Sequence, residues 1–203
     1  MFKKLAADAL GLSDIGVIVA PADFDKVDSD DYLFGEDGEK IFFLIKSKKD
    51  EYCFTNLALI HVDGDSAVSS KRSIKRYEYA SHPIDNVAIE TAGTVDRDVE
   101  LKFTVDGNVR FSIDVRKSFI EQLKDVYKAL HTIGKLQRLD AQARDHAVQV
   151  LGQMGSMFKL NAAASPEVPV QFFNTLLAGV NEAVQQRHTR RDFGFVFERY
   201  IKA

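Results

Sequence analysis

The chain has 203 residues, of which 45% are hydrophobic and 28% are charged, and its net charge at pH 7 is -3. This composition is typical of a globular protein with one well-buried core and a smaller appendage, and the lack of a basic excess argues against a dedicated nucleic-acid-binding protein. With one cysteine, Cys53, and with no secretion signal or apolar run long enough to cross a membrane, the sequence predicts a cytoplasmic protein without an intrachain disulfide.

Residues 1–38 are predicted to form a short helix and an acidic lead-in. The helix covers Phe2–Leu10, where apolar residues recur with amphipathic spacing. The following stretch, PADFDKVDSDDYLFGEDGEK, is too highly charged for a core element. We therefore expect a solvated loop there.

Residues 39–134 are predicted to form an antiparallel β-domain. Seven short apolar runs separated by turn residues lie between Glu39 and Val115. The last two, VELKFTV and VRFSIDV, alternate apolar and polar residues around the turn DGN. This pattern predicts a seven-stranded antiparallel barrel. Ser118 then begins a helix to about Ile133, whose apolar stripe is expected to cap the barrel.

Residues 135–203 are predicted to form a helical extension. Two apolar stripes with helical spacing are separated by NAAASPEVP, which indicates an antiparallel helical hairpin followed by a last short helix after Asp192. These stripes must be buried against the barrel or against another copy of the chain, and since the barrel has its own capping helix, we expect the second. The residues predicted for this packing are Leu139, Val150, Phe158, Phe173, Leu176, Leu177, Val180 and Phe197.

The acidic run Asp96, Asp98 and Glu100 is the one pattern that resembles a metal or phosphoryl site. It does not fit a calcium EF-hand loop, because Leu101 and Gly107 stand where a glycine and a carboxylate are required. In a strand these acids point away from the face of Val99, Leu101, Phe103 and Val105. The preferred interpretation is a solvent-facing strand surface, and a metal-dependent enzyme acting on a small ligand or a phosphoryl group is the alternative.

A second candidate site is basic. Its residues surround the first predicted hairpin turn and the fourth predicted strand, and they are Lys46, Lys48, Lys49, Lys71, Arg72, Lys75 and Arg76. They predict either a charged edge that discourages strand aggregation or a surface that binds anionic lipid.

Three stretches resemble the bacterial pleckstrin-homology family. They are the run F-T-N-x-x-L-I at Phe54–Ile60, the run E-T-A-G-T-x-D-x-D-x-E-L-K, and the helix SFIEQLKDVYKAL. The last third of the chain, ending in DFGFVFERYI, is similar to the helical extension called the YvbH-like oligomerisation region.

The resemblance implies a pleckstrin-homology barrel in a cytoplasmic homo-oligomer, with no enzymatic activity and no cofactor. Closed rotational symmetry is the default for such an assembly. The function expected is a scaffold or binding module for a protein, a peptide or a membrane surface, without nucleic acid. In eukaryotic lipid-binding relatives, basic residues at the first hairpin bind inositol phosphates. Here Asp50 and Glu51 follow that hairpin and oppose a polyphosphate.

Overall fold

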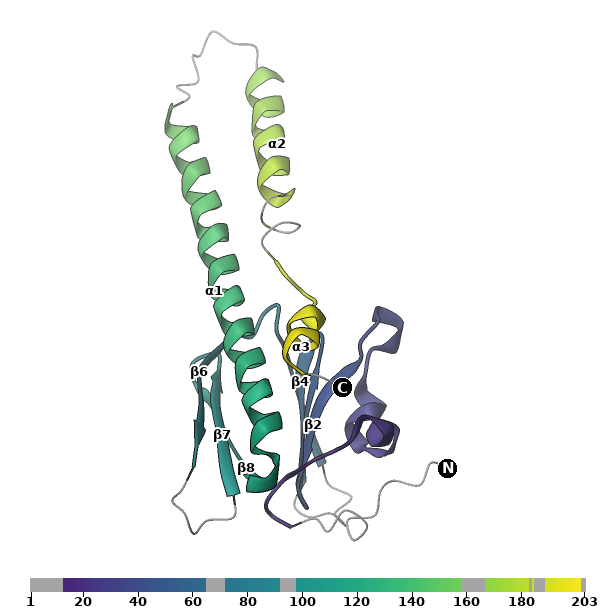
Figure 1. Ribbon diagram of the computed structural model, residues 1–203. Coiled ribbons are helices and arrows are strands. Elements are labelled where there is room, and N and C mark those ends of the chain that lie inside the picture. The colour runs from purple at the N-terminus through teal and green to yellow at the C-terminus, as the bar shows by residue number, and fades with distance from the viewer. Residues whose placement is uncertain are drawn as a thin grey trace. The chain divides into compact units, whose positions relative to one another are not determined.

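The computed structural model describes residues 13–64, 72–91, 98–157, 167–182, 184 and 189–201 (Figure 1). It divides into two compact units, one formed by residues 1–134 together with 191–203, and the other by residues 135–190. The first is called the β unit below, and the second is called the hairpin. The predicted helix at Phe2–Leu10 lies outside the described residues. None of the described helices has the combined length and apolar character that a membrane crossing requires.

The β unit contains two antiparallel sheets in its described part. The five-stranded sheet has the order β1 (Val17–Ile18), β2 (Ile41–Lys46), β3 (Asp50–Thr55), β4 (Ala58–Gly64) and β5 (Arg72–Glu78). The three-stranded sheet has the order β6 (Ile84–Glu90), β7 (Asp98–Val105) and β8 (Val109–Arg116). Strands β2–β8 are the seven predicted runs. They form two sheets rather than one closed barrel, and β5 and β6 are edge strands.

The β-hairpin formed by strands β7 and β8 has the predicted alternation of apolar and polar residues. Leu101 pairs with Ile113 and Phe103 pairs with Phe111, and all four side chains are buried. The chain reverses at Asp106 and Gly107, which both have positive φ. Asp and Gly tolerate this conformation better than other residues, so the turn chemistry and the strand periodicity set the same register.

Gly16 joins the two sheets along one side. Its N–H donates to the carbonyl of Asp114 at 2.7 Å, and its carbonyl accepts from the N–H of Arg116 at 3.0 Å, while the next residue, Val17, begins β1 beside β2. A Cβ atom at position 16 would lie 2.8 Å from Cγ2 of Ile45 and 3.0 Å from the Asp114 carbonyl oxygen. Only glycine allows this approach without displacing a neighbour.

We therefore expect Gly16→Ala to lower the free energy of unfolding by about 1–3 kcal/mol, because the added methyl group overpacks the contact between the sheets. The measurement is urea denaturation followed by circular dichroism. Gly35→Ala is the matched control, since a Cβ there meets no atom within 4 Å. Equal stability of the two variants would contradict a close contact at Gly16.

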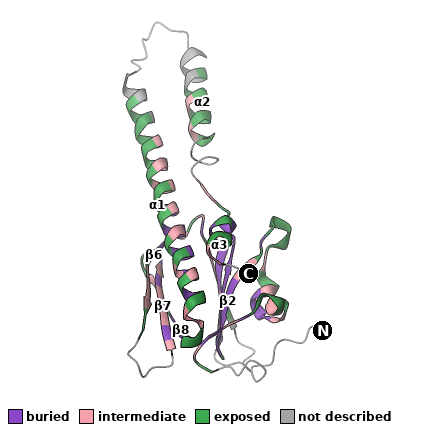
Figure 2. Ribbon diagram, in the orientation of Figure 1, coloured by how far each residue is buried: buried purple, intermediate pink, exposed green. Residues whose placement is uncertain are grey.

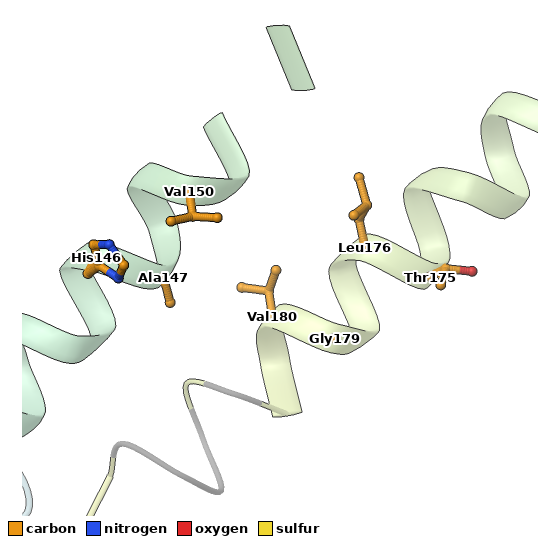
Figure 3. A pocket seen from close by; sticks show the side chains of 7 residues that line it. All are labelled: His146, Ala147, Val150, Thr175, Leu176, Gly179 and Val180. Atoms are coloured by element: carbon orange, nitrogen blue, oxygen red, sulfur yellow. The ribbon is translucent and has the colours of Figure 1, made fainter. Parts of the chain in front are cut away.

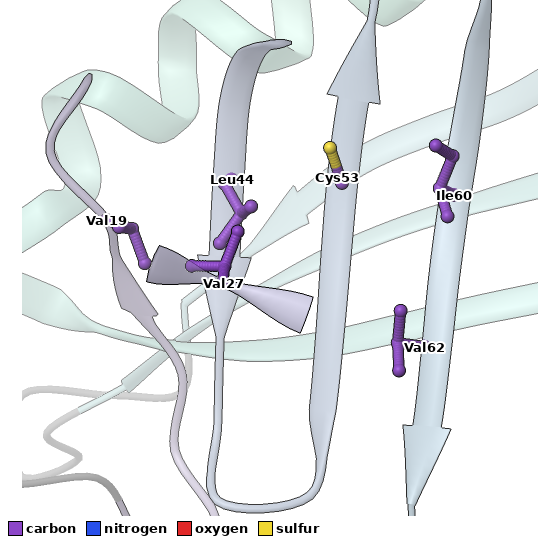
Figure 4. Close-up of a cluster of buried hydrophobic side chains, with 6 residues drawn as sticks. All are labelled: Val19, Val27, Leu44, Cys53, Ile60 and Val62. Atoms are coloured by element: carbon purple, nitrogen blue, oxygen red, sulfur yellow. The ribbon is translucent and has the colours of Figure 1, made fainter. Parts of the chain in front are cut away.

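The acidic lead-in is not the solvated loop that its composition predicts. It forms the short 3-10 helices η2 (Pro21–Lys26), η3 (Asp28–Tyr32) and η4 (Gly35–Asp37), and Val27 is buried. Figure 4 shows Val27 of this segment beside Leu44, among the buried side chains on one face of the five-stranded sheet. The buried cluster there consists of Val19, Val27, Leu44, Cys53, Ile60 and Val62. Strands β2–β4 therefore carry buried residues on both faces, including the adjacent buried pairs Leu44–Ile45, Cys53–Phe54 and Leu59–Ile60.

Helix α1 (Ile120–Met157) is one continuous helix that begins in the β unit and ends in the hairpin. The predicted stop near Ile133 is absent, because Gly134 costs only about 1 kcal/mol in a helix and does not break it. Leu123, Val126 and Leu130 are buried as the predicted stripe requires. Helix α2 (Glu167–Glu182) is antiparallel to the second part of α1 (Figure 1).

Helix α3 (Gly194–Tyr200) belongs to the β unit rather than to the hairpin. The extension predicted over residues 135–203 therefore ends, as a compact unit, at Arg190. Apolar periodicity identifies a face that must be buried, but it does not identify what buries it.

Candidate functional site

The hairpin contains an apolar groove between its two helices. Three residues of α1, His146, Ala147 and Val150, face residues of α2 across a cavity of about 410 Å³ (Figure 3). The α2 residues are Thr175, Leu176, Gly179 and Val180. Leu176 and Val180 were predicted from the stripe. Gly179 and His146 were not, because a glycine and a polar ring add nothing to a hydrophobic pattern.

Both helices of the hairpin leave large apolar side chains in solvent, as the predominance of exposed residues in Figure 2 illustrates. Phe173 is 62% exposed, and Leu139, Leu177 and Val150 are also exposed. The stretch of α2 from Val168 to Asn181 contains no charged residue. A charge-free helical stretch with exposed aromatic and aliphatic groups is typical of an interface rather than of a solvated surface.

Two of the residues predicted to pack in the helical extension, Phe158 and Phe197, are not found on the described surface of the hairpin. Phe158 lies outside the described residues. Phe197 is fully buried in the β unit, where its ring stacks on Phe42 with a centroid separation of 5.3 Å and contacts Tyr79 at 6.2 Å. Phe197 therefore anchors α3 to the five-stranded sheet and does not face the hairpin groove.

Polar contacts fix the start of this anchored segment. The Asn56 side-chain amide donates to the Asp192 carboxylate at 2.8 Å, and the Phe193 N–H donates to the Asn56 carbonyl at 2.8 Å. The Asp192 carboxylate also accepts from the Gly194 N–H at 2.7 Å, next to the buried ring of Phe193. These contacts tie the residues just before α3, whose N-cap is Phe193, to Asn56.

Two of the predicted basic residues are engaged in ion pairs with buried carboxylates. Lys46 pairs with Glu51, whose carboxylate also accepts the N–H groups of Asp28 and Ser29 at 3.2 and 2.9 Å. Arg76 lies 3.1 Å from Glu39 and stacks over Phe34 at 4.4 Å from the ring centroid.

The Glu39 carboxylate also accepts a hydrogen bond from the Thr55 hydroxyl at 2.6 Å. Its charge is therefore compensated by Arg76 and by a hydrogen bond within the β unit. Neither Glu39 nor Glu51 was predicted from the sequence. The available signal for Glu51 was its alternation with Cys53 and Thr55 on one face of β3.

The other basic residues are dispersed. Lys48 and Lys49 are exposed in the turn between β2 and β3, and Lys75 is half exposed at 3.8 Å from Asp63. Lys71 lies outside the described residues, and the backbone of Arg72 begins β5. The seven predicted residues therefore do not converge on one site in the described part of the chain.

The described part of the acidic run, Asp98 and Glu100, lies on the solvent-facing side of β7, as strand alternation predicts. Glu100 and Asp98 flank the buried Val99, and Asp96 lies outside the described residues. Glu100 accepts hydrogen bonds from Lys102 and Ser112. Both bonds lower the pKa of its carboxyl group, and the bond from Lys102 has the larger effect. Glu100 and Glu90 each lie 2.8 Å from the Lys102 ammonium and raise its pKa to about 12.

The Glu90–Lys102–Glu100 network is an ordinary strand-surface arrangement, in which lysine neutralises the carboxylates. Within the described residues, no three His, Cys, Asp or Glu side chains gather in a way that could hold a metal ion. Cys53 is not a catalytic nucleophile of the usual kind. Burial raises the pKa of its thiol to about 12, so it is not the reactive thiolate that nucleophilic catalysis needs.

Comparisons with known proteins agree with this fold. The family model described as "Bacterial PH domain" matches residues 9–134. The chain is 50% identical to the uncharacterized protein YvbH of Bacillus subtilis (strain 168) over 203 residues, which is 99% of each chain. It is 30% identical to the uncharacterized protein YjqA of the same organism over 97 residues, or 48% of this chain and 76% of YjqA.

A solved structure is similar over most of the chain. The crystal structure of a PH-domain-containing bacterial protein from Exiguobacterium sibiricum 255-15 superposes with a TM-score of 0.81 at 45% sequence identity. The superposition covers 93% of this chain and 100% of that one. With the two-sheet β unit, the helix that follows it and the family match, the chain belongs to the bacterial PH domain family.

Proposed function

We propose that this protein is a non-enzymatic, self-associating module, in which the hairpin joins copies of the chain and each β unit presents a surface to a protein or peptide partner. The observation that carries the proposal is the uncharged stretch of α2 from Val168 to Asn181, with Phe173 and Leu177 exposed beside an apolar groove of about 410 Å³. Burying such a surface against a second copy removes apolar area from water, which is the main favourable term in association.

The chemistry of the groove supports an association role rather than a catalytic one. Its lining is aliphatic apart from His146 and Thr175, and the groove contains no pair of acid and base groups. Exposed leucine, valine and phenylalanine on a helical hairpin can supply the packed centre of an interface between copies. A closed ring is the expected form of such an assembly, because closure satisfies every interface.

An anionic-lipid surface is a weaker candidate. Lys46 and Arg76 are paired with carboxylates inside the β unit, so they do not add positive potential to a membrane-facing surface. The exposed Lys48 and Lys49 are followed at once by Asp50 and Glu51. We therefore place the partner among proteins and peptides.

The double variant Phe173→Asp, Leu177→Asp is expected to dissociate the assembly, because two carboxylates would have to be desolvated in the interface. Sedimentation velocity at micromolar concentration measures the change, and we expect at least about a hundredfold weaker self-association. Both residues are exposed, so each copy retains its fold.

The matched control is Asn174→Asp, Asn181→Asp, which adds the same charge to exposed positions of α2 without removing apolar area. It should associate like the natural sequence at physiological salt. A natural chain that sediments as a monomer at micromolar concentration would refute self-association itself. Equal association of both double variants would place the interface away from Phe173 and Leu177.

A further inference from the structure

Strand β5 is an edge strand of the five-stranded sheet as far as the chain is described. It pairs with β4 on one side, and no strand among the described residues pairs with its other side. The Tyr79 N–H donates to the Leu57 carbonyl at 2.9 Å, which continues the ladder beyond β5. Because hydrogen-bonded pairs alternate along an antiparallel ladder, the backbone N–H and C=O groups of Ile74, Arg76 and Glu78 point outward from the sheet.

The two faces beside this edge differ in chemistry. On the outer face, Ile74 is 38% exposed and the Phe34 ring, under the guanidinium of Arg76, is 51% exposed. On the opposite face, Ser73 and Lys75 are exposed. An added strand would therefore place one set of alternate side chains beside Ile74 and Phe34, and the other set beside Lys75.

The charge of β5 indicates which kind of peptide strand can pair with it. Strand β5, with the sequence RSIKRYE, carries three basic residues and one acidic residue. Arg76 pairs with the buried Glu39, whereas Lys75 lies 3.8 Å from Asp63 in a pair whose two side chains are each 49% exposed, so solvent screens that pair. Two β5 edges from two copies would bring like charges together, so this edge opposes self-pairing. An extended strand with carboxylates facing Lys75 is complementary to it.

We propose that the β5 edge is a docking site for an extended peptide segment of another protein that alternates apolar and acidic residues. The peptide adds as a sixth strand of this sheet. Its main chain exchanges hydrogen bonds with Ile74, Arg76 and Glu78, its apolar side chains contact Ile74 and Phe34, and its carboxylates face Lys75. This is the strand-addition mode of peptide recognition, in which backbone bonds give affinity and alternate side chains give specificity.

The test uses the full chain and two fluorescein-labelled heptapeptides, Val-Glu-Val-Glu-Val-Glu-Val and its counterpart with Lys in place of Glu, with fluorescence anisotropy as the measurement. We expect the glutamate peptide to bind at least about tenfold more tightly than the lysine peptide. Lys75→Glu should reverse this preference. On binding, the amides of Ile74, Arg76 and Glu78 should gain protection from hydrogen exchange.

Ile74→Pro removes one outward N–H without removing a ladder bond, because proline is tolerated at outward positions of edge strands. We expect it to weaken binding by at least about tenfold, whereas the control Ile74→Thr keeps the N–H group and should bind within about threefold of the natural chain. No binding of the glutamate peptide at millimolar concentration, equal binding of the two peptides, or unchanged exchange at the three outward amides would overturn the proposal. The exchange and Lys75→Glu measurements decide the matter even if Ile74→Pro does not fold.

Discussion

Replacing Phe197 with alanine is expected to lower the free energy of unfolding of the β unit by about 3–5 kcal/mol, the usual cost of removing a buried phenylalanine ring. The ring is fully buried and packs on Phe42 and Tyr79. Because α3 spans only Gly194–Tyr200, it is too short to be helical by itself, and its order depends on this contact. Chemical denaturation followed by circular dichroism gives the change.

The same helix supplies the control for this experiment. Phe195 lies two residues before Phe197 and is 53% exposed, so Phe195→Ala removes an identical side chain without opening a cavity. Its effect should stay within about 0.5 kcal/mol. If Phe197→Ala is as stable as Phe195→Ala, α3 does not contribute to the β unit, and the division of the chain at Arg190 is wrong.

Glu51→Gln is expected to lower the free energy of unfolding by about 3–5 kcal/mol, because it leaves the nearly buried Lys46 ammonium without a counter-charge. It also weakens the acceptor of the Asp28 and Ser29 N–H groups, which holds the lead-in segment against the sheet. Denaturation in urea measures the loss. Limited proteolysis within residues 21–32 should accelerate at the same time, since that segment loses its anchor.

Two further variants isolate the contribution of the pair. Glu90→Gln removes one partner of the more exposed Lys102 and should destabilise the protein far less than Glu51→Gln does, because solvent screens an exposed ion pair. Lys46→Met combined with Glu51→Gln removes both charges and should be more stable than Glu51→Gln alone, because no unpaired charge remains. A double variant less stable than the single one would mean that the lysine stem, rather than its charge, stabilises the fold.

Local sequence patterns predicted the parts of the fold that depend on local geometry. The alternation of Leu101, Phe103 and Val105 identified the buried face of β7, and it also placed Glu100 in solvent. The hairpin surface was predicted in the same way, since helical spacing selected Leu139, Phe173 and Leu177 as apolar positions needing a partner. In each case the side-chain direction follows from the period of the backbone.

The features that sequence analysis missed depend on contacts between distant segments. Asp28 and Ser29 are buried because Glu51, more than twenty residues away, accepts their N–H groups. Phe197 has the spacing of a helical stripe, but the location of Phe42 and Tyr79 decides where it packs. Lys46 and Arg76 looked like a ligand surface for the same reason: the carboxylates that neutralise them come from other strands and loops.

The return of the chain to the β unit at Arg191 has a consequence for biogenesis. Residues 135–190 are inserted between two pieces of one compact unit. The ribosome therefore synthesises the hairpin before it adds Phe193 and Phe197, whose side chains are buried in the β unit. The part of the β unit around Phe42 and Tyr79 therefore stays uncovered while the hairpin is synthesised, and the β unit is completed only after that. These two rings form an apolar surface that is exposed on the nascent chain until Phe193 and Phe197 pack on it.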